Sequence, residues 1–121
     1  MTRRLLFALV IGFFGVPASL RADAISLAFL MPAAGNKVQG KGTFSVDPNR
    51  KFKKIEMVVR NAQNQVVSRT AGVVLMGTTE WGSISNQLNN GHYTVQAELT
   101  TTDLQGENQM TTPSNIMPWS Q

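Results

Sequence analysis

The chain has 121 residues, with 11 basic and seven acidic side chains, a formal net charge of +4 and no cysteine. This length suits one domain with a buried core and leaves no room for a second. Without cysteine we expect no disulfide, no lipid-modified cysteine and no thiol nucleophile.

The first 24 residues are typical of a secretory signal peptide. Arg3 and Arg4 precede an apolar run over 5–16, and Ala22-Asp23-Ala24 has the small-x-small pattern that signal peptidases recognise. We therefore expect cleavage after Ala24 and a periplasmic or extracellular bacterial protein. The alternative is an uncleaved membrane anchor, although the run is shorter than the about 20 residues that span a bilayer.

Removing this peptide leaves 97 residues with eight basic and six acidic side chains, a net charge of +2. Such a small excess does not predict nucleic-acid binding, which needs a clustered basic face. No stable membrane span is expected after cleavage. The predicted domains are a β-sandwich over 25–115 and a flexible C-terminal tail over 116–121, where Pro118 and polar residues mark a frayed end.

Alternating apolar and polar residues predict the first two strands. The first covers 25–31 and ends at Pro32, which cannot donate to a ladder. Its predicted inward face is Ile25, Leu27, Phe29 and Met31. The second covers 38–46, and Gly40 and Gly42 on its inward face predict a bulge or a close approach of backbones.

The middle of the chain continues the pattern. Asp47-Pro48-Asn49 predicts a turn, and a strand follows over 52–60 with an inward face of Ile55, Met57 and Val59 and a partly covered Val58 opposite. The Asn-rich segment 61–65 leads to a short return strand over 66–70. Region 72–85 is interpreted as two short strands around Gly77.

The stretch 88–99 combines a turn with a strictly alternating strand whose inward face is Tyr93, Val95, Ala97 and Leu99. A type I turn over 103–106 and a final strand over 109–115 complete the chain. No window carries a long helical stripe. The pattern predicts an all-β fold, an antiparallel sandwich of about seven strands.

The spacing Leu-x-x-Gly-x-Tyr of Leu88, Gly91 and Tyr93 resembles the tyrosine corner of immunoglobulin-like and fibronectin type III-like sandwiches. Segments 31–40 and 102–108 are similar to the start and the last turn of bacterial Ig-like modules. The resemblance implies a single Ig-like domain in which the Tyr93 hydroxyl bonds to the main chain upstream. The cysteines of antibody-type domains are missing, so the resemblance implies the bacterial Ig-like modules rather than antibody-type domains. It leaves function open, because such sandwiches serve many roles.

The residues give little support for catalysis or for a cofactor. His92 is the single histidine and has no acid close in sequence, and the acidic residues are scattered singly. We therefore predict no catalytic residue, no cofactor and no metal site. Small exported copper carriers of the CopC type are also sandwiches with a Gly-x-Tyr-x-Val strand. Their N-terminal and further His ligands have no counterpart here, so copper carriage is an alternative only.

Arg50, Lys51, Lys53 and Lys54 form a charge cluster beside Phe52. The cluster has two interpretations: a patch for an anionic partner, or a solvated run that protects a strand edge. Trp81 is expected to pack in the core, and Trp119 is expected to make a contact in the tail. A sugar-stacking platform formed by the two indoles is less favoured.

We expect a non-catalytic exported module with a structural, adhesive or protein- or glycan-binding role in the cell envelope or exterior. The expected partner is an unidentified protein or glycan. The alternative function is a small periplasmic carrier of a sugar or of a soft metal such as copper, and an enzyme has the least support.

Overall fold

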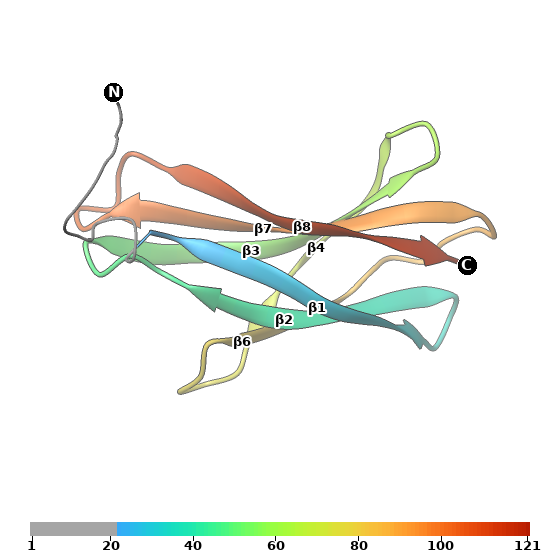
Figure 1. Ribbon diagram of the computed structural model, residues 1–121, viewed down its shortest axis with the longest axis horizontal. Coiled ribbons are helices and arrows are strands. Elements are labelled where there is room, and N and C mark those ends of the chain that lie inside the picture. The colour runs from blue at the N-terminus through green and yellow to red at the C-terminus, as the bar shows by residue number, and fades with distance from the viewer. Residues whose placement is uncertain (1–21) are drawn as a thin grey trace, which may run out of the picture.

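Residues 22–121 are described by a computed structural model, shown in Figure 1. Most of the predicted signal peptide therefore lies outside the described residues. Within them, no helix is long and apolar enough to cross a membrane. Residues 22–121 form eight strands, where about seven were predicted: β1 (Ala24–Ala33), β2 (Lys37–Ser45), β3 (Arg50–Asn61), β4 (Val66–Ala71), β5 (Val73–Val74), β6 (Glu80–Ile84), β7 (His92–Asp103) and β8 (Met110–Ser120).

The strands build two four-stranded antiparallel sheets packed face to face, which confirms the predicted all-β sandwich. We call them the β2 sheet, in the order β1-β2-β6-β5, and the β7 sheet, in the order β4-β3-β7-β8. Burial of one face of each sheet provides the driving force, at roughly 25 cal/mol per Å² of apolar surface. The buried side chains between the sheets include Val38, Ile55, Met57, Val95 and Leu99.

The glycines of β2 allow β1 and β6 to pack closely, as the sequence predicted. A Cβ at Gly42 would collide with the main-chain oxygen of Ser26 and lie 3.0 Å from the Trp81 indole nitrogen. That nitrogen donates a hydrogen bond to the Ser26 oxygen at 3.1 Å, and Trp81 is 2% exposed. The prediction that Trp81 packs in the core is confirmed.

Strand β1 contains a bulge that the alternation did not predict. Leu27 pairs with Gly42 and Phe29 pairs with Lys41, so Ala28 is the extra residue. The inward face of Ile25 and Leu27 is confirmed, but Phe29 and Met31 lie on the exposed side. Their predicted burial was wrong because an inserted residue exchanges the two faces of a strand.

The bulge is held by a residue distant in sequence. The Asn115 side chain of β8 accepts a hydrogen bond from Leu27 N at 2.9 Å and donates one to Leu27 O at 3.0 Å. The amide thus takes the place of a neighbouring strand at this edge of β1. Strands β1 and β8 consequently run side by side and join the two sheets along one flank (Figure 1).

The opposite flank is joined by the chain itself. At Gly72 the backbone leaves β4 in the β7 sheet and enters β5 in the β2 sheet, and Gly72 N donates to Ile55 O at 2.7 Å. A Cβ at Gly72 would approach the Ile55 side chain to 2.7 Å, so this crossing requires glycine. The Thr70 and Ser83 hydroxyls add a hydrogen bond of 2.8 Å between the two sheets.

The predicted flexible tail over 116–121 was wrong, because the last strand does not stop at residue 115. Strand β8 continues to Ser120 and pairs with β7 from Gln96↔Ile116 to His92↔Ser120. Met117 and Trp119 pack against the core, and Gly91 and Gln121 exchange two main-chain hydrogen bonds of 2.9 and 3.2 Å. Pro118 is tolerated because β8 is an edge strand, where one missing donor can face away from the sheet.

The outer face of the β7 sheet is covered by ionic side chains. Arg69 bonds Glu98 at 2.8 Å and Glu56 at 3.1 Å, and these bonds raise the pKa of Arg69. Val58, predicted to be partly covered, is fully buried on this face between its register partners Arg69 and Gln96. Long side chains can cover an apolar neighbour in this way while their charged ends stay in water.

Candidate functional site

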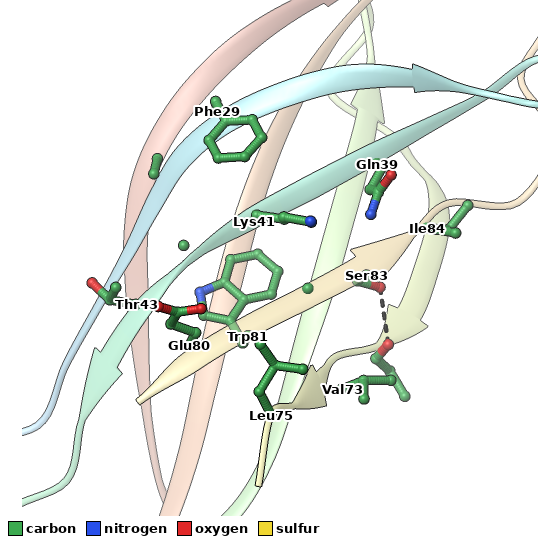
Figure 2. A pocket seen from close by; sticks show the side chains of 14 residues that line it. Phe29, Gln39, Lys41, Thr43, Val73, Leu75, Glu80, Trp81, Ser83 and Ile84 are labelled. Carbon is green, nitrogen blue, oxygen red and sulfur yellow. Dashed lines mark hydrogen bonds between the residues drawn. The ribbon is translucent and has the colours of Figure 1, made fainter. Parts of the chain in front are cut away.

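The outer face of the β2 sheet carries an open groove of about 730 Å³ (Figure 2). One row of directly opposed residues crosses all four strands of this sheet. In that row Phe29 pairs with Lys41, Lys41 with Gly82, and Gly82 with Val73. Directly opposed residues in a sheet point to the same side, so these side chains belong to one surface.

Gly82 makes the groove deep at its centre. The site has no side chain between Lys41 and Val73, and a Cβ placed there would meet only ordinary contacts, with Gly40 O and Lys41 Cγ both at 3.6 Å. The glycine is therefore not required for packing beneath it. Its effect is to leave space above the backbone of β6.

The bulge in β1 brings Phe29 to the groove. Without the extra residue, Ala28 would oppose Lys41, and Phe29 would point to the core. With it, Phe29 is 43% exposed and lies beside Lys41 at one wall of the groove (Figure 2).

The groove is mainly apolar and has two charged side chains. Its exposed apolar residues come from three strands and the loop after β5: Phe29, Val73, Leu75 and Ile84. Val73 is 68% exposed, which is unusual for a β-branched residue in a strand pair. Lys41 and Glu80 provide one positive and one negative charge among the lining residues. The arrangement can take an apolar partner with a few polar groups.

The polar residues at the inner end of the groove have structural partners. The Ser83 hydroxyl donates to Ala71 O at 2.9 Å, the bond drawn in Figure 2. It also contacts the Thr70 hydroxyl, as described above. Ser83 is thus part of the connection between the sheets rather than a free nucleophile.

The four residues of the predicted basic cluster have different surroundings. Arg50 is turned to the protein: it donates to the Thr101 hydroxyl at 2.9 Å and to Asn108 O at 2.7 Å. Lys54 lies 3.7 Å from Glu56. A bulge at Lys53 interrupts the pairing of β3 with β7, and Lys51 and Lys53 are exposed.

The residues of the predicted tyrosine corner lie together. The Tyr93 hydroxyl donates to Asn89 O at 2.6 Å, four residues upstream. Leu88 is buried, and Leu88 N donates to Asn36 O at 2.8 Å, which ties the segment before β7 to the turn between β1 and β2. A Cβ built at Gly91 would lie 3.8 Å from the Tyr93 hydroxyl, so this glycine lies beside the Tyr93 ring. These contacts are architectural.

The chemistry-bearing side chains are dispersed. The Nδ1 atom of His92 lies 3.0 Å from the Ser120 hydroxyl on the exposed edge of the β7 sheet. Over residues 22–121, no three His, Cys, Asp or Glu side chains gather as a metal site would need. Met57 is buried in the core, whereas Met76 is exposed at the turn after β5.

Sequence reasoning missed the groove altogether. Phe29 was predicted to face the core, and Val73, Leu75 and Ile84 lie in region 72–85, which was interpreted only as two short strands. The available signal was the apolar excess of Val73, Val74, Leu75 and Met76, which exceeds what two short strands can bury on one side. The bulge that adds Phe29 has no local signal.

A scan against protein-family models gave no match, and no curated protein matched the sequence. Among solved structures, the chain is similar to CopC from Methylosinus trichosporium OB3b, with a TM-score of 0.41 and 12% identity over 74% of this chain and 90% of that chain. At this identity and score the likeness carries no argument about a ligand.

Proposed function

We propose that the protein is an exported, non-catalytic Ig-like module that binds a partner protein of the bacterial cell envelope or exterior. The observation that carries this proposal is the groove on the outer face of the β2 sheet. Four exposed apolar side chains converge there around a glycine, on a sheet face that has no covering layer among the described residues. Concave sites lined mainly by apolar side chains with a few polar groups are typical of binding sites.

The lining favours a protein partner over a glycan. Sugar-binding faces commonly present exposed aromatic rings, and here the indole of Trp81 is buried beneath the sheet. Phe29 is the one exposed aromatic side chain that lines the groove. Aliphatic residues such as Val73, Leu75 and Ile84 suit the apolar side chains of a peptide segment.

Lys41 and Glu80 would orient that segment. Charged groups at the rim of an interface contribute to specificity and association rate more than to affinity. Export is supported by the charged, apolar and small-residue regions of the first 24 residues. The Ig-like assignment is supported by the Tyr93 contact with Asn89 O.

The test is site-specific photo-cross-linking in the envelope fraction of producing cells. A photoreactive amino acid replaces Val73 in the groove, and in a control protein it replaces Ile116, an exposed apolar residue of the β7 sheet that is 60% exposed. We expect a discrete protein adduct from position 73 and none of the same mass from position 116.

A second variant separates binding from folding. Gly82→Leu fills the groove, and because a Cβ at this site meets only ordinary contacts, we expect the variant to remain folded, which its thermal unfolding checks. The adduct at position 73 should disappear in this variant. Equal adducts from both positions, or an adduct that survives Gly82→Leu, would contradict the proposed site, and an adduct removed by glycosidases but not by proteases would reassign it to a glycan.

A further inference from the structure

Asp23 is an integral part of the folded domain, although it precedes β1. Its side chain is 3% exposed. The carboxylate accepts a hydrogen bond from the Thr101 hydroxyl at 2.6 Å and another from Asp47 N at 2.8 Å. It also lies 3.7 Å from Arg50 Nε.

These contacts connect four parts of the chain at one end of the sandwich. Thr101 belongs to β7, Asp47 to the turn after β2, and Arg50 begins β3. Arg50 is itself held between Thr101 and Asn108, so the acid balances the charge of a guanidinium that is largely turned away from water. The Asp23 carboxylate is thus the shared acceptor of this polar network.

The small-x-small pattern at 22–24 conflicts with this network. Cleavage after Ala24 would remove Asp23, leave the Thr101 hydroxyl and Asp47 N without their acceptor, and take the neighbouring carboxylate away from Arg50. Unpartnered polar groups away from solvent are costly, and Thr101 is fully buried in the complete structure. The same cut would delete Ala24, which pairs with Ser45 at the start of β1.

We infer that the signal peptide is removed at the Ala22–Asp23 bond, so that Asp23 becomes the first residue of the exported domain. Water adds across this peptide bond, which leaves a carboxylate on Ala22 and an amine on Asp23. Ala22 supplies the small residue directly before the bond, and Leu20 stands where the small-x-small pattern has its other small residue. The inference rests on the export that is part of the proposed function.

The test is the first residue of the exported protein. The full chain is expressed in a bacterium that exports it, and the product of the periplasmic or extracellular fraction is identified by intact mass and N-terminal sequencing. We expect Asp23. Any other first residue in the exported product, Ile25 above all, overturns the inference but leaves export intact. A product confined to the cytoplasm with its signal peptide uncut overturns both.

A pair of variants locates the bond independently. The side chains of Ala22 and Ala24 are both exposed, so Ala22→Leu and Ala24→Leu leave the fold undisturbed. Ala24→Leu should be processed with Asp23 still first, whereas Ala22→Leu should accumulate as precursor. A block by Ala24→Leu would place the cut after residue 24 and overturn the inference.

Thermal stability tests the role of the Asp23 side chain separately. Asp23→Ala in the exported protein should lower the thermal midpoint by about 4 °C or more, the shift typical of a destabilised domain of this size. Glu107→Gln, a charge removal on an exposed side chain, serves as the control and should leave the midpoint unchanged. Equal midpoints for both variants would overturn the assignment of Asp23 to the domain.

Discussion

Tyr93 positions the start of β7 with a single hydroxyl. Its hydrogen bond to Asn89 O is short, at 2.6 Å, and its ring lies beside Gly91. Tyr93→Phe keeps the ring and removes this bond, so we expect a loss of about 0.5–1.5 kcal/mol in the free energy of unfolding, measured by urea denaturation. An unchanged free energy would show that the hydroxyl does not hold the corner.

Asp103 gives the turn between β7 and β8 a dependence on pH. The bond from Glu107 N, with those from Asn108 and Gln105, lowers the pKa of Asp103 below its ordinary value of 3.8. A lowered folded pKa stabilises the fold above the unfolded pKa, and this contribution is lost as pH falls from about 4 through the folded pKa.

Asp103→Asn tests this dependence because it keeps an acceptor oxygen in the turn but does not titrate. The thermal midpoint of the variant should decline less steeply than that of the parent between about pH 4 and pH 2, as followed by circular dichroism. Parallel declines in the two proteins would show that Asp103 does not contribute to acid sensitivity.

At the scale of the element, the glycines of neighbouring strands differ in what they do. Gly42 on β2 faces inward against Ser26, whereas Gly82 on β6 faces outward into the groove. Gly42→Ala forces apart backbones that are in contact, so we expect a loss at or above the upper end of the about 1–3 kcal/mol that overpacking costs.

Gly82→Ala is the matched control for this experiment. It adds the same methyl group at a site where the nearest atoms would be 3.6 Å away. Alanine is also favoured over glycine within a strand, because glycine loses more conformational entropy on folding. We expect neutral or slightly higher stability by urea denaturation. A similar loss for both variants would contradict the difference between the inner and outer faces.

The strands follow local alternation, and therefore most of the fold could be predicted. The inward faces of β2, β3 and β7 depend on residues two positions apart, and the sequence shows these directly. The bulge in β1 depends instead on Asn115, which lies 88 residues away from Leu27. Since no local pattern contains such a contact, the exposure of Phe29 and the groove itself could not be predicted.

At the scale of the whole molecule, the two sheets are joined by polar contacts along both flanks and at one end. Asn115 bridges β8 to β1, Gly72 carries the chain across the opposite flank, and Asp23 joins three segments at the end of the sandwich. Without disulfides, these contacts and the apolar core between them hold the sheets in register. The outer face of the β2 sheet takes no part in them.

The second half of β8 is required for this closure. A chain that ends at Asn115 loses the pairing of Ile116–Ser120 with β7 and the packing of Met117 and Trp119 on the core. A large side chain contributes about 1.5–3 kcal/mol when fully buried. Met117 and Trp119 are partly buried, so we expect the truncated chain to lose about 2 kcal/mol or more of its unfolding free energy.

The truncation is compared with Ile116→Ala in urea titrations followed by circular dichroism. Ile116 is exposed, so its shortening should change stability by less than about 0.5 kcal/mol. If the truncated chain unfolds at the same urea concentration as the full chain, residues 116–121 are a tail after all. A loss confined to the truncated chain means that the sandwich is complete only when β8 reaches Ser120.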